Sequence, residues 1–217
     1  SSVRYTSDAV TFTDFQPQLD SVPTFLLQAR IFIPYYGRLL AFNTIEGTAL
    51  GNPNNKNFFN RVRFSQEGNP IDPDAWRTDI FGRGGFADAP TSERIVNAIF
   101  FKNTILVFFE RSTWQLRFVG EYGTPFLFER ISSDFGSEST FSGILFDQGV
   151  LAIGDRAIIS AVSTSVQRID EDIPDVVFSI RNRLGGPQRV YGVRDFQKEV
   201  VYWSYPQSEF GGAEQYF

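Results

Sequence analysis

The sequence predicts an all-β protein that forms part of a β-propeller, built from four-stranded antiparallel blades with long inserted loops. Two observations predict this class. Aromatic and β-branched residues, including 24 Phe among 217 residues, favour strands over helices. An apolar strand, a short turn and a second apolar strand also recur around four turn residues that are 66, 46 and 48 positions apart, Gly37, Asn103, Gly149 and Gln197. A period in the forties made of short antiparallel strands is typical of propeller blades.

The N-terminal part is expected to hold a connection and then the first blade. Residues 1–28 read as a connection with one weak strand, at Ala9–Phe12. The first blade is expected near residues 29–65, with a turn-rich loop at Gly47–Asn57, because Gly, Asn and Pro favour the backbone angles of turns. The partial propeller as a whole is expected to span residues 29–217.

Arginine alternates with apolar residues in the last strand of this first blade. In Asn60–Ser65, Arg61 and Arg63 alternate with Val62 and Phe64. This period of two predicts a half-buried strand with an exposed arginine face. Exposed positions that pair with acidic residues are expected for these arginines and likewise for Arg111 and Arg117.

Residues 66–92 form a long insert rich in Gly and Pro. Its composition is too irregular for a sheet, so a functional or interface loop is expected. Binding energy at interfaces concentrates in aromatic and Arg side chains. The sequence therefore predicts a subunit interface with Trp76, Arg77 and Phe81 at its centre. Trp is more often an anchor of the core than a residue that stacks on a ligand. We therefore expect Trp76, Trp114 and Trp203 to be core anchors in general.

Three further blades follow the insert. Four strands are expected within residues 95–132 and four within 141–169, and a further blade begins in 189–217. A short helical turn is expected at Val176–Asn182. The chain has no initiator Met and ends within an apolar segment, which indicates a fragment of a longer chain whose Gln215–Phe217 pairs with missing chain or with a partner.

Composition excludes several kinds of chemistry. The chain has no His and no Cys, so it offers no imidazole base, thiolate nucleophile or zinc site of nitrogen and sulfur ligands. The net charge is −5 and the pI about 4.9, which argues against specific nucleic-acid binding. Apolar runs are too short for a membrane helix. We therefore expect no catalytic residues, no cofactor, no metal site and no membrane insertion.

Three local motifs have only weak functional interpretations. The acidic run Asp170–Asp175 lacks the order of a calcium loop, and Gly82–Gly85 lacks the Lys and the helix of a phosphate loop. Ser65–Trp76 faintly resembles the Asp-box of sialidase-type propellers, although Glu67 stands where that motif has Asp. Release of sugar dependent on Glu67 or Asp74 would support that enzyme reading.

A second resemblance covers roughly residues 25–206. An N-R-V-x-x-S strand, a G-N-P turn and a Trp resemble the blade signature of the nozzle, or tail tubular B, proteins of bacteriophage tails, and the matching residues are Asn60, Arg61, Val62, Ser65, Gly68, Pro70 and Trp76. Asn97–Leu116 is similar to that family's next blade. Gly136–Ser142 with the turn at Asp147–Gly149 is similar to a third, and Tyr202–Pro206 to a fourth.

This resemblance implies a structural component of a phage tail or head-to-tail connector that forms part of a ring-shaped conduit for DNA ejection. It implies no enzyme activity. The expected partners are copies of the chain in a ring and other virion proteins, with transient passage of DNA. The expected location is the virion, after assembly in the host cytoplasm. The alternative is a carbohydrate-binding or sialidase-like, glycan-cleaving propeller that acts on the host surface.

Overall fold

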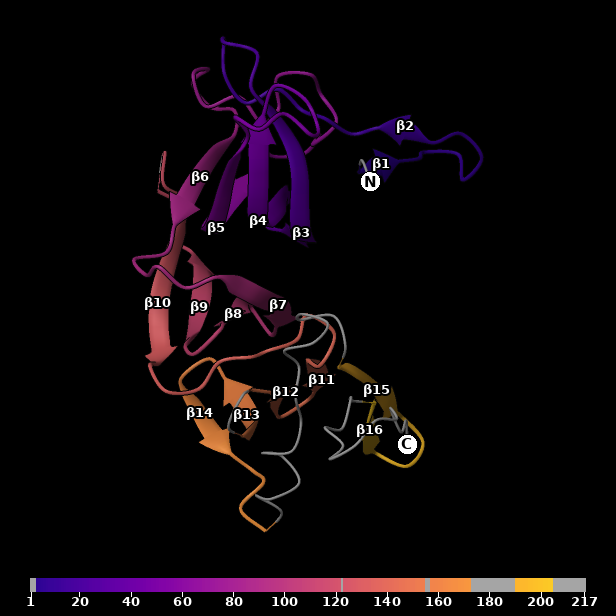
Figure 1. Ribbon diagram of the computed structural model, residues 1–217, viewed down its shortest axis with the longest axis vertical. Coiled ribbons are helices and arrows are strands. Elements are labelled where there is room, and N and C mark those ends of the chain that lie inside the picture. Colours follow the sequence, from indigo (N-terminus) through magenta and orange to yellow (C-terminus); the bar gives the residue numbers. More distant parts are fainter. Residues whose placement is uncertain (1–2, 122, 155–156, 173–189, 205–217) are drawn as a thin grey trace. The chain divides into compact units, whose positions relative to one another are not determined.

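The computed structural model describes residues 3–121, 123–154, 157–172 and 190–204. Within these ranges every regular element is a strand, and the strands form several four-stranded antiparallel sheets (Figure 1). The all-β class and the four-stranded sheets are thereby confirmed. The helical turn expected at 176–182 and the pairing expected for 215–217 lie outside the described residues.

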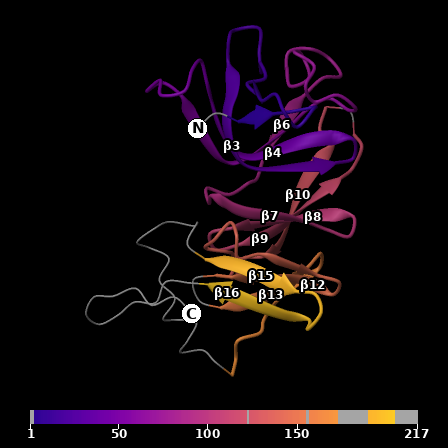
Figure 2. The same cartoon turned by 90° about the vertical axis from the view of Figure 1, so that its right-hand side faces the viewer.

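The chain divides into two compact units. The first comprises residues 1–92 and 118–127, and the second comprises residues 93–117 and 128–217. The first unit contains a sheet in the order β3-β4-β5-β6 and a hairpin of β1 and β2. Figure 2 shows β3 and β4 as its longest paired strands. The strands are β1 (Arg4–Tyr5), β2 (Thr13–Asp14), β3 (Phe25–Tyr35), β4 (Arg38–Gly47), β5 (Lys56–Phe64) and β6 (Gly85–Asp88).

The turn between β3 and β4 follows directly from the sequence. Tyr35 pairs with Arg38, which leaves Tyr36 and Gly37 as a two-residue loop. Both have positive φ, 47° and 68°, as a type I′ turn requires. This turn matches the twist of the flanking strands, so the hairpin predicted around Gly37 forms, although β3 begins four residues earlier than expected.

The weak strand expected at Ala9–Phe12 is wrong. The structure places β1 and β2 on either side of this segment and leaves the segment itself outside any strand. The Asp8 carboxylate accepts hydrogen bonds from the backbone N–H groups of Val10 (2.9 Å) and Thr11 (2.7 Å). A side chain that occupies its neighbours' backbone donors favours a turn over a strand.

The insert at residues 66–92 is not entirely irregular, because it contains the fourth strand of the first sheet. β6 pairs antiparallel with β5, with Asp88 opposite Arg61 and Phe86 opposite Arg63. Two bonds from the Arg61 guanidinium to the Asp88 carboxylate, at 2.7 and 2.8 Å, support this register. A four-residue strand that begins with glycine carries too little apolar alternation to be predicted from sequence.

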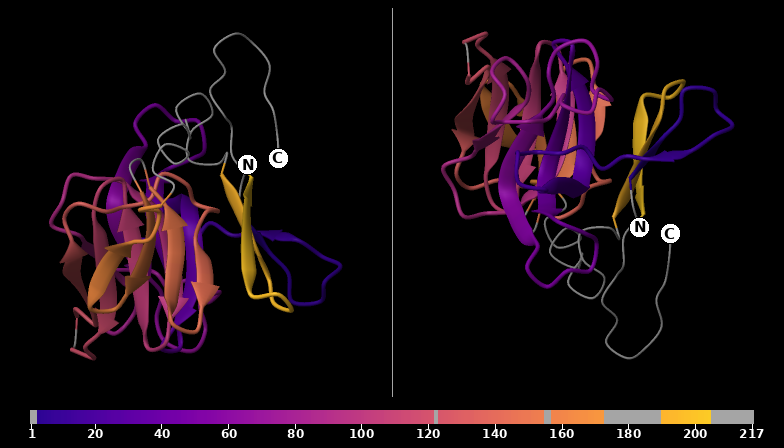
Figure 3. Two further views of the ribbon diagram at one scale, coloured as in Figure 1. Left: turned by 90° about the horizontal axis from the view of Figure 1, so that it is seen from below. Right: turned by 90° about the horizontal axis from the view of Figure 1, so that it is seen from above.

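The second unit contains most of the strands that follow the insert. Its sheets have the orders β10-β9-β8-β7, β11-β12-β13-β14 and β15-β16. Figure 3 draws the β15–β16 hairpin in yellow and the strands of the preceding sheet in orange. The strands are β7 (Ile95–Phe101), β8 (Thr104–Phe109), β9 (Thr113–Phe118), β10 (Phe126–Ser132), β11 (Ile144–Phe146), β12 (Gly149–Ile153), β13 (Ile158–Val162), β14 (Ser165–Arg168), β15 (Tyr191–Asp195) and β16 (Val200–Ser204).

Ile99, Leu145 and Gly192, which share a position in the repeat, lie in the first strands of three separate sheets, β7, β11 and β15. Neither a helix nor one continuous sheet passes through them. Gly192 allows a close approach between sheets, because a Cβ there would lie 2.8 Å from Ile144 Cδ1 and Cγ1 in β11. The repeat in the sequence therefore corresponds to a repeat of sheets.

The sheets of the second unit bury apolar side chains against each other. One buried cluster combines β7 and β8 with the strands β12 and β13 of the next sheet, and its members are Phe101, Leu106, Phe108, Val150, Ala152, Ala157, Ile159 and Ala161. Burial of apolar area is the main stabilising contribution in such an arrangement. Apolar residues of β7, β8, β12 and β13 thus form a core shared by two sheets, and β8 is buried along its whole length.

Candidate interaction loop and arginine-lined cavity

The 66–92 segment, called the insert here, is attached to the first sheet by backbone hydrogen bonds. The N–H of Gly68 donates to Gly37 O (2.8 Å), and the N–H of Thr78 donates to Leu19 O (3.0 Å). The first bond joins the insert to the β3–β4 turn and the second joins it to the N-terminal connection. These attachments fix the base of the segment that was expected to contact other subunits.

Trp76 is an internal anchor of the first unit. Its side chain is fully buried, and its indole N–H donates to Pro70 O at 2.9 Å. It belongs to a buried cluster with Phe15, whose ring meets it edge-on at 5.9 Å, and the other buried members are Leu19, Leu26, Ala41 and Ala75. A side chain with no exposed surface cannot itself contact another subunit. The expectation that Trp76 lies at the centre of an interface is therefore corrected to a role in the core.

The other two tryptophans also serve packing. Trp114 in β9 is 5 % exposed, and its indole N–H donates to the Ser112 hydroxyl at 2.9 Å. Trp203 in β16 is half-buried, and its indole N–H donates to Ser142 O at 2.9 Å. The general interpretation of these residues as core anchors holds for Trp76 and Trp114, and Trp203 joins two neighbouring sheets.

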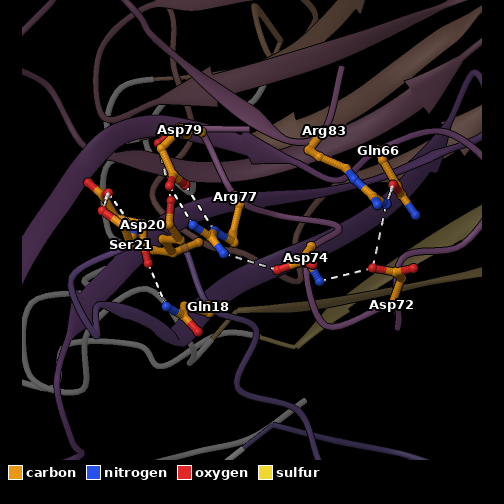
Figure 4. A network of polar contacts seen from close by, with 11 residues as sticks. Gln18, Asp20, Ser21, Gln66, Asp72, Asp74, Arg77, Asp79 and Arg83 are labelled. Carbon is orange, nitrogen blue, oxygen red and sulfur yellow. Dashed lines mark hydrogen bonds and ion pairs between the residues drawn. The ribbon is translucent and has the colours of Figure 1, made fainter. Parts of the chain in front are cut away.

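Arg77 lies within a network of polar side chains from the insert and from the N-terminal connection at residues 18–21 (Figure 4). Its Nε and Nη2 donate to the two carboxylate oxygens of Asp79 at 3.0 and 2.5 Å, and Nη1 donates to Asp74 at 3.3 Å. The bond from Arg77 is the main cause that lowers the pKa of Asp79 below its usual 3.8. The guanidinium is thus held by two carboxylates of its own segment.

Phe81 is the exposed member of the predicted interface set, with 85 % of its surface accessible. It lines a surface depression of about 470 Å³ in the first unit. Rings of Phe86 and Phe118 share this lining with charged groups, namely Arg38, Glu67, Arg83 and Glu121. Contacts between subunits remain a prediction for Arg77 and Phe81.

The glycines of Gly82–Gly85 are explained by packing. A Cβ on Gly84 would lie 2.6 Å from the Cα of Trp76, and one on Gly85 would collide with the Phe64 ring. Side chains at these two positions would push the insert away from the sheet. Gly85 also begins β6, so the segment leads into a strand and not into a helix of the kind a phosphate loop requires.

The acidic run contains a structural carboxylate in its described part. Asp170 is buried and accepts bonds from Arg168 Nε at 2.8 Å and Nη2 at 3.2 Å. Within the described parts of the chain, no three acidic residues gather as a metal site would require. The remaining residues of the run, from 173 onward, lie outside those parts.

Arg61 and Arg63 are buried, contrary to the exposed arginine face expected from their alternation. They are 8 % and 6 % exposed. Glu46, 4 % exposed at the end of β4, accepts from Arg63 Nε (2.9 Å) and Nη2 (2.6 Å) and from Arg61 Nη1 (3.4 Å). Pairing with acids was predicted correctly, whereas exposure was wrong because Glu46 compensates the charges inside the unit.

Aromatic rings complete the enclosure of these arginines. The Arg61 guanidinium carbon lies 3.6 Å from the ring centre of Phe58 and 3.9 Å from that of Phe86. Arg63 lies 4.9 Å from the same Phe86 ring. A planar guanidinium stacks well on an aromatic face while its edge donates hydrogen bonds. The alternation of Arg with apolar residues signalled one shared face. The buried acid is visible only in the side-chain contacts, because the strand register places Glu46 opposite Lys56 and Arg63 opposite Ala41.

The other two arginines of the prediction are exposed as expected. Arg117 keeps 52 % of its side chain accessible and bonds Glu129 at 2.6 Å. Arg111 is exposed, and its backbone N–H donates to Glu93 at 2.8 Å. Arg111 lies in the turn between β8 and β9, whereas Arg117 lies within β9, as the buried pair lies within β5.

Comparison with protein-family models and with curated protein sequences gave no match. Among the residues that the structure describes, no helix is long and apolar enough to cross a bilayer. The features that bear on function are the four-stranded sheets, the insert and the resemblance of the sequence to nozzle proteins.

Proposed function

We propose that this chain is part of a β-propeller that acts as a structural component of a bacteriophage tail or head-to-tail connector. In this proposal each four-stranded sheet is one blade. Copies of the chain and other virion proteins form a ring-shaped conduit through which DNA passes during ejection. The protein is assembled in the host cytoplasm, remains in the virion, and has no catalytic site, cofactor or metal.

The contact between the first strands of two consecutive sheets is the observation that carries the proposal. Phe141, just before β11, and Tyr191, at the start of β15, form an isolated parallel bridge. The N–H of Gly192 donates to Phe141 O at 2.8 Å, and the two rings stack with centres 5.1 Å apart. Blades arranged around an axis must place equivalent strands side by side in the same direction, as these two are.

The resemblance to nozzle proteins links this architecture to a role. It includes Asn60, whose side-chain amide donates to Ala89 O (2.8 Å) and Thr91 O (2.9 Å) and so fixes the exit of the insert. It also includes Ser65, which is buried and whose hydroxyl accepts from the N–H of Leu39 at 3.0 Å. The resembling residues thus have structural tasks, which supports a structural role over a catalytic one.

A glycan-binding or glycan-cleaving propeller is the alternative function. The depression next to Phe81 favours it, because aromatic rings and the carboxylates of Glu67 and Glu121 share its lining. Such a combination suits sugars, which stack their apolar faces on rings and donate hydroxyl hydrogen bonds to carboxylates. Asp74, the other acid of the sialidase-like reading, pairs with Arg77.

The proposal is tested by asking whether the chain is a component of virus particles and where on the particle it lies. Virus particles purified from the source of the sequence are analysed by mass spectrometry, and an antibody against this chain is located on them by electron microscopy. We expect the chain in intact particles, with label at the tail or the head-to-tail junction. Absence of the chain from particles, or release of sugar from host glycans by the purified protein, would refute the structural role.

A further inference from the structure

A second cavity lies beside the buried arginines of the first unit. Its volume is about 370 Å³, within the range of roughly 300–1,000 Å³ that is usual for small-ligand sites. The end of β4, the following loop and β5 from Lys56 to Arg63 form its walls, with Thr24 from the N-terminal connection. This cavity is distinct from the depression at Phe81, because no residue lines both.

The charges that line this cavity are mainly positive. Lys56, Arg61 and Arg63 contribute cations, and Glu46 contributes the one carboxylate of the lining. Glu46 is already saturated, since it accepts bonds from both arginines and from the Thr44 hydroxyl at 2.8 Å. Arg61 is also paired with Asp88, so three cations face two carboxylates, and the remaining excess of one positive charge favours a ligand with negative charge.

Two buried polar atoms of lining residues have no hydrogen-bond partner. They are Nη1 of Arg63 and Oδ1 of Asn55, a donor and an acceptor. Glu46 binds Arg63 through Nε and Nη2, so Nη1 on the other side of the guanidinium is left over. Buried polar groups are rarely left unpaired, and a partner supplied by a ligand is one physical explanation for them.

The remaining lining is rich in amides and hydroxyls. Asn52, Asn54, Thr24 and Thr48 supply both donors and acceptors, and Phe58 supplies a ring. A ligand with several hydroxyl groups matches this surface better than an apolar one. A polyanion such as nucleic acid is disfavoured, because the chain carries a net charge of −5 and Glu46 adjoins the cations.

We propose that this cavity binds a saccharide that carries a carboxylate, such as a uronic acid unit. The carboxylate accepts from Arg63 Nη1, and a neighbouring hydroxyl donates to Asn55 Oδ1. Both protein atoms are shielded from solvent, so binding requires side chains of the lining to move, among them Asn55, which packs against Gly47. This site goes beyond the structural role and does not depend on it.

The direct test is calorimetric titration of the full 217-residue chain with two matched sugars, methyl β-glucuronide and methyl β-glucoside. The two sugars differ only at C6, where the glucuronide carries a carboxylate and the glucoside a hydroxymethyl group. We expect saturable binding of the glucuronide and at least tenfold weaker binding of the glucoside. No binding of the glucuronide at millimolar concentration, or equal binding of both sugars, would overturn the proposal.

Variants locate the binding. Asn55→Asp places a carboxylate in the cavity where it competes for the Arg63 guanidinium, so we expect glucuronide affinity to fall at least tenfold. Asn69→Asp is the matched control, because it adds the same charge in an exposed turn where Asn69 Oδ1 accepts from the N–H of Ile71. An equal loss in both variants would mean that the sugar binds elsewhere.

A variant at the exposed rim avoids any disturbance of the buried ion pairs. Lys56→Gln removes one cation of the lining, and Lys56 is solvent-exposed, so its loss leaves the fold intact. We expect two- to fivefold weaker binding of the glucuronide and no change for the glucoside. Unchanged glucuronide affinity in both Lys56→Gln and Asn55→Asp would exclude this cavity as the site.

Discussion

The interiors of the two units differ in how they satisfy buried strand residues. In the second unit, β7, β8, β12 and β13 meet through purely apolar side chains such as Phe108 and Ile159. In the first unit, β5 buries Arg61 and Arg63 beside apolar neighbours and compensates them with Glu46 and two phenylalanine rings. Strands rich in apolar residues, such as β8, form the interior of the second unit. In the first unit a strand that alternates Arg with apolar residues is buried because Glu46 of the neighbouring strand compensates its charge.

The insert explains the difference. It supplies β6, with Phe86 and Asp88 opposite the two arginines, and it supplies Trp76 to the apolar cluster of the same unit. In the second unit, β7 and β8 pack against β12 and β13 of the next sheet. A long insert therefore serves here as part of the fold of the first unit, in addition to any contact that it makes with a partner.

The largest effect is expected for Trp76→Ala. Loss of a fully buried Trp should destabilise the first unit by about 3–5 kcal/mol, through lost burial and a residual cavity. Phe81→Ala, at an 85 % exposed position of the same insert, should change stability by less than about 0.5 kcal/mol. Urea unfolding followed by Trp fluorescence and hydrogen exchange measures both. Equal stability of the two variants would contradict the assignment of Trp76 to the core.

A slightly smaller effect is expected when the buried ion pairs are broken. Glu46→Gln leaves the buried guanidinium of Arg63 without a carboxylate, while Arg61 keeps its pair with Asp88. It should destabilise the first unit by about 3 kcal/mol, the lower end for a broken buried pair, because the amide oxygen still accepts one bond. Glu129→Gln, which removes the half-buried partner of the exposed Arg117, should cost about 0–1 kcal/mol. Denaturant midpoints that are equal for both variants would show that burial does not distinguish them.

Gly84→Ala tests the close contact between the insert and its own core. The added methyl group would lie 2.6 Å from the Cα of Trp76, so the backbone must shift. We expect a loss of about 1–3 kcal/mol, typical of overpacking. Hydrogen exchange should accelerate in the first unit and remain unchanged in the second. Unchanged exchange throughout would mean that the insert is not packed as described.

The smallest effect concerns pH. The bond from Arg77 lowers the pKa of Asp79 below 3.8, so this pair contributes stability that is present above about pH 4 and lost as pH falls through the lowered pKa. Asp79→Asn removes this dependence. Stability of the first unit, measured by urea midpoints at pH 5 and pH 3, should fall less in the variant than in the native protein. Identical slopes would contradict the role of the pair.

The sequence predicted the class of fold and most strands because each strand carries its own alternation and its own turn. The hairpin at Tyr36 and Gly37 is an example, since both turn residues have the positive φ that the turn requires. β6 escaped prediction because its four residues become a strand only through pairing with β5. The segment at residues 9–12 was misassigned because local bonds to Asp8 outweigh its strand propensity.

The candidate sites were less predictable than the fold. Trp76 looked like an interface residue because sequence position placed it in an irregular segment, whereas burial is a property of the folded unit. The arginine-lined cavity escaped prediction because its residues come from two strands and a loop, and Glu46 meets Arg63 only through tertiary pairing. Phe81 is exposed, and its contact with another subunit stays a prediction.

A cryo-electron microscopy reconstruction of the full-length protein in its assembled form tests the central claim most directly. If the sheets are propeller blades, successive sheets surround one axis, and β3, β7, β11 and β15 lie nearest to it in parallel. The copies then form a ring around a continuous channel. Sheets that pack as a sandwich without a common axis, or β6, β10 and β14 nearest to the axis, would contradict the account.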